Sequence, residues 1–83
     1  MANEQKIKKI LSDILKIKIS SINNKTTHQT IKTWDSVAHL HIVMALENNF
    51  KISFTPNEVV SLLSYSKIMS ILKKKLNNYL SFF

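Results

Sequence analysis

The chain has 83 residues, with 12 basic side chains against five acidic ones and a formal net charge of +7. A chain of this length forms one small domain, so we expect a single domain over residues 1–83. It contains no cysteine, which excludes a disulfide framework, a thiolate zinc site and a cysteine nucleophile. The first residues lack the apolar run of a signal peptide and no stretch is long enough to span a membrane, so we expect a cytoplasmic protein without membrane attachment.

The positive charge by itself suggests nucleic acid as a partner. Every one of the 12 basic residues is a lysine, so the bidentate contact that arginine makes with guanine cannot form. The lysines are also spread over both terminal regions and the loops. We therefore expect no nucleic-acid partner, and a small basic helical nucleic-acid-binding domain stays as the alternative from another functional class.

A first helix is predicted to begin near Asn3, which can act as its N-cap. Its apolar residues recur at the spacing of one helical face: Ile7, Ile10, Leu11, Ile14 and Leu15. Polar residues then predominate from about Lys16 to Trp34, which predicts a long loop. Because so long a loop needs apolar anchors in a compact domain, we expect these to be Ile19, Ile22, Ile31 and Trp34.

A second helix is predicted from Ser36 to Phe50, with Asp35 as its N-cap. At 100° per residue this helix carries two apolar stripes. The first is an ordinary core stripe that includes His39 and consists otherwise of Ile42, Val43, Leu46 and Phe50. The second lies beside Ser36 and consists of Val37, Leu40 and Met44. Either the helix is buried on both sides, or the second stripe is an exposed patch that marks a partner site.

A short third helix is predicted by Thr55 as its N-cap, Pro56 at its first position and Glu58 reaching back to the cap. We expect its apolar residues to face inward: Val59, Val60, Leu62 and Leu63. Ser64 is the predicted cap of a last helix, whose apolar face consists of Ile68, Ile71, Leu72 and Leu76. The predicted fold class is all-α: a small bundle of three main helices and one short helix, with a long loop between the first and second helices.

Asp35, Ser36 and Val37 at a helix start closely resemble the acyl carrier protein family when taken with the residues downstream. Those residues are Val43 to Glu47, Phe50, Ile52 and Pro56 at their spacing. In that family a phosphopantetheinyl transferase moves 4'-phosphopantetheine from coenzyme A onto the serine that follows the aspartate. The resemblance implies that Ser36 carries this arm covalently and that Asp35 supports the transfer. The thiol of the arm then carries an acyl group as a thioester between enzymes, so the chain itself is not an enzyme.

The resemblance also gives the second stripe a role, since partner enzymes would contact Val37, Leu40, His41, Met44 and Glu47. The implied partners are a phosphopantetheinyl transferase, an acyl- or aminoacyl-loading ligase, and a downstream acyltransferase or synthase. We expect the carrier to be a monomer.

The chain departs from the family in its charge, because family members are usually acidic along the second helix. His41 and Asn48 stand where acids are common, and Lys32, Thr33 and Trp34 stand where a glycine is usual. We therefore hypothesise a dedicated carrier of a specialised biosynthetic pathway, in fatty acid or polyketide chemistry. An aminoacyl carrier, for example of D-alanine, or a peptidyl carrier is the alternative.

The histidines invite a metal site, but His39 and His41 lie two apart on a helix and point to different faces, so we expect no metal. His39, on the core stripe, is predicted to be a partly buried, hydrogen-bonded neutral imidazole. Trp34 is predicted to pack near Ala38 as a hydrophobic staple on the helix start. The alternative role for Trp34 is to shield a bound acyl chain.

Overall fold

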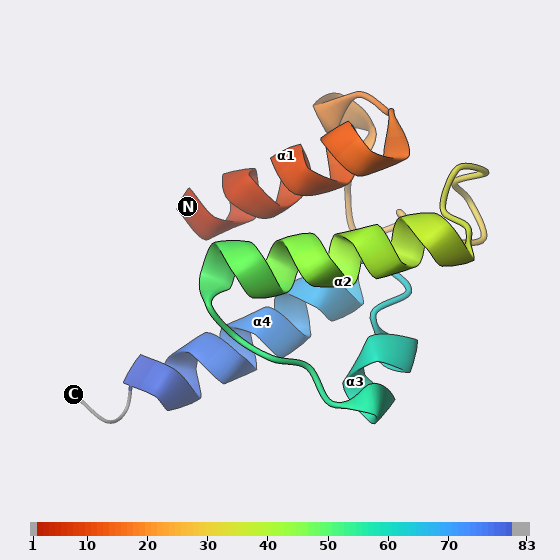
Figure 1. The fold of residues 1–83 in the computed structure, drawn as a ribbon. Coiled ribbons are helices and arrows are strands. Elements are labelled where there is room, and N and C mark those ends of the chain that lie inside the picture. Colours follow the sequence, from red (N-terminus) through yellow and green to blue (C-terminus); the bar gives the residue numbers. More distant parts are fainter. Residues whose placement is uncertain (1, 81–83) are drawn as a thin grey trace.

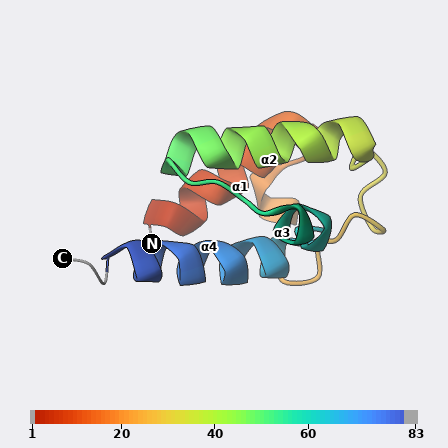
Figure 2. The ribbon, with the colours of Figure 1, turned by 60° about the horizontal axis from the view of Figure 1, so that its bottom comes forward.

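The computed structural model describes residues 2–80 and contains four α-helices and one 3₁₀-helix within them (Figure 1). The elements are α1 (Ala2–Leu15), η1 (Ile19–Ser21), α2 (Ser36–Phe50), α3 (Pro56–Ser61) and α4 (Tyr65–Leu80). α1 and α2 run in opposite directions, whereas α2 and α4 run in the same direction (Figures 1 and 2). The structure confirms the predicted bundle of three main helices and one short helix, with a long loop before α2.

The core lies where α1, α2 and α4 face one another, and its centre is fully shielded from solvent. Leu11 of α1, Leu46 of α2 and Ile68 of α4 are each 0% exposed. The stripes predicted for these helices contribute five further buried residues: Ile7, Leu15, Ile42, Val43 and Leu72. Burial of this apolar surface is the main stabilising contribution in so small a domain. None of the helices in residues 2–80 is both long and apolar enough to cross a membrane.

Three of the four predicted helix starts are confirmed by hydrogen bonds. The Asp35 carboxylate accepts the amide N–H of Ala38 over 2.9 Å. At α3 the Thr55 amide donates to Glu58 Oε1 over 2.8 Å, and the Glu58 amide donates to Thr55 Oγ1 over 3.2 Å. The Ser64 hydroxyl accepts the third amide of α4. The cap predicted for α1 is wrong: because alanine extends a helix readily, α1 begins at Ala2, and Asn3 lies inside its first turn.

The loop between α1 and α2 is held by apolar anchors, as predicted, but the set differs. Ile22 and Trp34 are buried, and Ile31 is partly buried against the core. Ile19 is 40% exposed, so its prediction as an anchor is wrong. It begins η1, a single 3₁₀ turn without a buried residue, whose backbone bonds hold the loop without burying a side chain.

Thr26 is a polar anchor of the same loop, and no pattern in the sequence indicates it. Its side-chain oxygen accepts the Asn23 amide over 2.9 Å and donates to the Ser21 carbonyl over 3.2 Å. Its own carbonyl accepts the amide of Tyr65, the first residue of α4, over 3.0 Å. Because every polar group of this buried residue has a partner, it can sit in the core and tie the loop to α4.

Candidate functional site

Ser36 is exposed and is the first residue of α2, directly after the Asp35 cap. The start of α2 lies at one end of the bundle, where the long loop reaches it (Figure 1). The amides of the first helical turn have no carbonyl partner within the helix, and the helix dipole is positive there. An exposed hydroxyl at this position is therefore suited to carry a phosphate ester.

The side chains around Ser36 are held by a hydrogen-bonded chain through His39. The indole N–H of Trp34 donates to Nδ1 of His39 over 3.1 Å. Nε2 of the same imidazole lies 2.7 Å from the carbonyl oxygen of Val59 in α3 and donates to it. Both ring nitrogens are thus occupied, so His39 is not available as a base for Ser36.

The hydrophobic staple predicted for Trp34 is present, and the partner of the Trp34 ring is His39. Trp34 is buried, and its ring stacks on that of His39 with 6.3 Å between the ring centroids. With Asp35 as N-cap, residue 39 is the fourth position of the helix, which is where the partner of a hydrophobic staple stands. The prediction placed Trp34 near Ala38, which is buried in the same core cluster, and His39 is the next residue along the helix.

A cavity of about 390 Å³ opens beside Ser36. Trp34 and His39 line it, together with Leu40, His28 of the long loop and Leu63, which precedes α4. His28 is fixed there because its backbone amide and Nδ1 both contact the Leu63 carbonyl, over 2.9 and 3.2 Å. The site thus combines an exposed hydroxyl with an adjoining hollow whose walls are held in place.

The second stripe of α2 is exposed. Val37, Leu40 and Met44 are 62%, 56% and 59% exposed, and we call these three residues the apolar strip. Val60 of α3 is 67% exposed, so the prediction that it faces inward is wrong. A six-residue helix is too short for its apolar spacing to show which face is buried, and here the partly buried residue is Val59.

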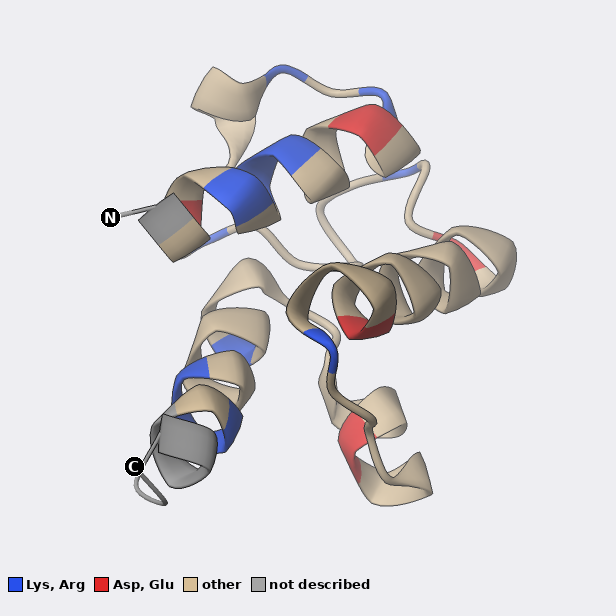
Figure 3. Cartoon of the chain, turned by 60° about the vertical axis from the view of Figure 1, so that its left-hand side comes forward, with Lys and Arg blue, Asp and Glu red and all other residues tan. Residues whose placement is uncertain are grey.

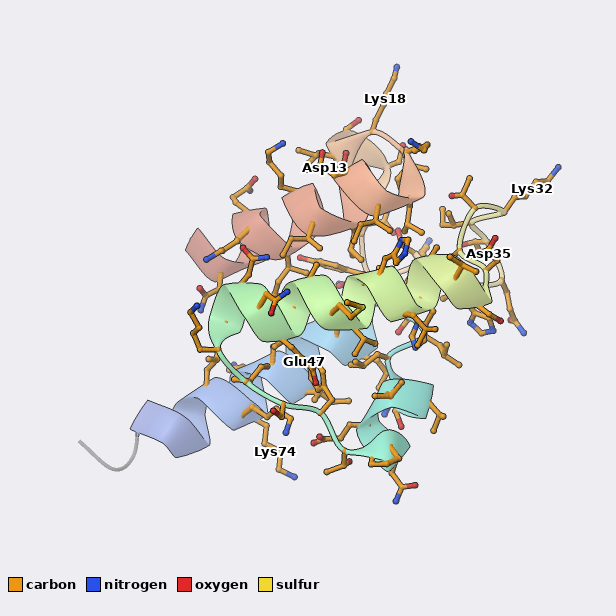
Figure 4. The ribbon with its side chains drawn as sticks, in the orientation of Figure 1. Asp13, Lys18, Lys32, Asp35, Glu47 and Lys74 are labelled. Carbon is orange, nitrogen blue, oxygen red and sulfur yellow. The ribbon has the colours of Figure 1, made fainter. Side chains whose placement is uncertain are left out.

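Of the two remaining predicted partner contacts, His41 is exposed on α2, whereas Glu47 is partly buried. One carboxylate oxygen of Glu47 accepts the Phe54 amide over 2.8 Å. Figure 4 shows this side chain on the side of α2 that faces the segment leading to α3. Glu47 thus binds the segment that leads to α3, and its contact with partner enzymes stays a prediction. No cluster of three or more potential metal-binding side chains occurs in the part of the chain that the structure describes.

A comparison of the structure and a comparison of the sequence with known proteins both find acyl carrier proteins. The fold matches the solution NMR structure of a holo acyl carrier protein from Nitrosomonas europaea with a TM-score of 0.78 and 21% identity, covering 93% of this chain and 99% of that one. No family model matches the chain. The acyl carrier protein of Buchnera aphidicola subsp. Schizaphis graminum is 32% identical over 72 residues, which are 87% of this chain and 91% of that protein.

The fold and the comparisons thus define a small helical carrier domain. The chain belongs to the acyl carrier protein family, whose members carry acyl groups and are not enzymes.

Proposed function

We propose that Ser36 receives 4'-phosphopantetheine from coenzyme A and that the thiol of this arm carries an acyl group as a thioester. The observation that carries the proposal is the exposed Ser36 hydroxyl at the capped start of α2. The solved relative from Nitrosomonas europaea is a holo carrier, which supports a prosthetic group in the family. The thiol that this cysteine-free chain lacks would come with the arm.

In the transfer, the Ser36 oxygen forms a new ester bond to the phosphorus that bears pantetheine. The pyrophosphate bond of coenzyme A breaks, and adenosine 3',5'-bisphosphate leaves. His39 has both nitrogens occupied, so the base that accepts the serine proton belongs to the phosphopantetheinyl transferase. Asp35 keeps one oxygen on the Ala38 amide, and its carboxylate helps to position the incoming phosphate and the magnesium held by the transferase.

The cavity beside Ser36 can hold the part of the arm, or of its cargo, that lies nearest the serine. Its walls include the indole of Trp34 and the side chains of Leu40 and Leu63. These apolar groups support the shielding role considered for Trp34, alongside its packing at the helix start.

The partners are the transferase, a loading ligase and a downstream acyltransferase or synthase, which contact the apolar strip and His41. The exposed part of α2 has His41 and Asn48 where the family is usually acidic, which supports a dedicated carrier of a specialised pathway in the cytoplasm.

An aminoacyl or peptidyl cargo is the alternative, because cargo chemistry resides in the loading enzyme. The membership of the acyl carrier protein family argues against the nucleic-acid-binding alternative.

The proposal is tested on protein isolated from its own cells. After digestion, tandem mass spectrometry of the peptide that contains Ser36 should locate phosphopantetheine on this residue. Mild hydroxylamine should release the cargo as a hydroxamate, whose mass separates an acyl from an aminoacyl group. Unmodified Ser36 in protein from cells grown under several conditions would contradict the proposal.

A further inference from the structure

The five carboxylates of the chain all have partners within the chain. Three are paired with lysines in salt bridges of 2.9 to 3.5 Å: Glu4 with Lys8, Asp13 with Lys9, and Glu58 with Lys75. The other two, Asp35 and Glu47, each accept a backbone amide. The chain therefore presents few acidic groups that a basic partner surface could bind.

The other nine lysines form no salt bridge within residues 2–80, and they carry the excess charge. They are Lys6, Lys16, Lys18, Lys25, Lys32, Lys51, Lys67, Lys73 and Lys74. Figure 4 shows Lys18, Lys32 and Lys74 extending away from the body of the protein. The charge available to a partner is thus positive.

These lysines leave α2 itself free of basic side chains but flank both of its ends. Lys32 precedes the Asp35 cap by three residues, and Lys51 is the C-cap of α2. Glu47 is the one acidic residue in the sequence of α2, which contains no lysine or arginine, and it is the residue bound to the Phe54 amide. Figure 3 accordingly shows most of α2 in tan, the colour of residues other than lysine, arginine, aspartate and glutamate. The apolar strip itself is therefore uncharged, and a lysine lies near each end of α2. Exposed Asp35, beside Ser36, has one carboxylate oxygen bound to the Ala38 amide.

We propose that the enzymes that act on Ser36 dock on α2 with an apolar site that has an acidic rim. The inference rests on the proposed function and names the chemistry of its partners. The apolar strip supplies contact area that is desolvated on binding. Lys32 and Lys51 favour a partner enzyme whose apolar site is surrounded by negative charges. A basic rim would meet these ammonium groups and the net charge of +7, and would be repelled.

The test uses one broad-specificity phosphopantetheinyl transferase in two forms. The first form keeps the basic side chains of its carrier-docking surface, and in the second these side chains are changed to glutamate. The initial rate of mass gain at Ser36 is measured by intact mass spectrometry with each form, from about 50 mM to about 500 mM salt, a range that shortens the reach of charges severalfold. The carrier variants are Lys32→Glu with Lys51→Glu, and as matched control Lys73→Glu with Lys74→Glu on α4, which changes the net charge equally.

With the parent carrier, we expect the acidic-rim transferase to act about tenfold faster than the basic-rim form at low salt. Its rate should fall as salt rises, whereas the rate of the basic-rim form should rise. The Lys32→Glu and Lys51→Glu carrier should reverse this preference. The α4 control should keep the preference of the parent.

Equal rates with both transferase forms, or an equal change in the two carrier variants, would overturn the docking proposal while Ser36 is still modified. The absence of transfer to Ser36 by either form at every salt concentration would instead overturn the proposed function itself. The two failures are therefore distinguishable in one data set.

Discussion

The Trp34 indole donates its N–H to Nδ1 of His39 over 3.1 Å, and this bond fixes the state of the imidazole. A carbonyl oxygen can only accept, so Nε2 of His39 carries the proton that it donates to Val59. The ring is therefore neutral, as predicted from its place on the core stripe. It joins the long loop, α2 and α3 at the point where Ser36 is presented.

Replacing His39 should loosen this junction. We expect His39→Ala to lower the free energy of unfolding by about 2 to 3 kcal/mol, because it leaves the Trp34 N–H and the Val59 carbonyl without their partner. His41→Ala, at an exposed position of the same helix, should change it by less than about 0.5 kcal/mol. Urea unfolding followed by circular dichroism measures both. Equal losses would show that the His39 bonds contribute nothing.

The two stripes of α2 should respond differently to the same substitution. Leu46→Ala removes a fully buried side chain and should cost about 2 to 5 kcal/mol of stability. Leu40→Ala removes a side chain that is 56% exposed, so its stability should stay within about 0.5 kcal/mol of the parent. Leu40→Ala should instead slow phosphopantetheine transfer, measured by intact mass over time. A folded Leu40→Ala carrier that is modified at the parent rate would argue against partner contact at this position.

The pH dependence of stability should include a contribution from Glu58. The hydrogen bond from Lys75, and secondarily that from the Thr55 amide, hold the pKa of this carboxyl below its ordinary value of 4.5. The lowered pKa stabilises the fold fully above pH 4.5, and this contribution is lost as pH falls through the folded-state pKa.

Glu58→Gln tests this contribution because glutamine can still accept the Thr55 amide but cannot pair with Lys75 as an ion. We expect it to cost about 0.5 to 1 kcal/mol at pH 7 and to unfold at the same denaturant concentration as the parent at low pH. The Asp13→Asn variant is the control, since its salt bridge with Lys9 is 64 to 69% exposed. A Glu58→Gln deficit that persists at low pH would contradict the assignment to ionised Glu58.

The buried Thr26 should be sensitive to loss of its hydroxyl alone. Thr26→Val keeps the shape but leaves the Asn23 amide and the Ser21 carbonyl without their partner, so we expect a loss of about 1 to 3 kcal/mol. Thr27→Val is the control and should cost less, because the Thr27 hydroxyl accepts the Gln29 and Thr30 amides within a solvent-exposed turn. Thermal unfolding measures the difference. A smaller loss for Thr26→Val than for Thr27→Val would contradict its role as an anchor.

The parts of the fold that local chemistry determines were predictable from the sequence. Asp35, Thr55 and Ser64 act as caps because side-chain oxygens at these positions meet free amides a few residues along the chain. The two stripes of α2 follow from the helical period, although the sequence left open whether the second stripe is covered. The exposure of Val37, Leu40 and Met44 settles that question.

The parts that depend on distant contacts were not predictable. Thr26 is buried because Tyr65 and the turn at Asn23 supply its partners, which no local pattern indicates. The exposure of Val60 follows from how α3 lies on the bundle. The partner of Trp34 is the exception, because counting four positions from the Asp35 cap identifies His39 from the sequence alone.

The central claim is that Ser36 is the attachment point of the prosthetic arm. Its most direct test is the intact mass of the protein after incubation with coenzyme A, magnesium and a broad-specificity phosphopantetheinyl transferase, beside Ser36→Ala and the exposed control Ser53→Ala. We predict a gain of one phosphopantetheine in the parent and in Ser53→Ala, and none in Ser36→Ala. No gain in the parent with several active transferases, or an equal gain in Ser36→Ala, would contradict the claim.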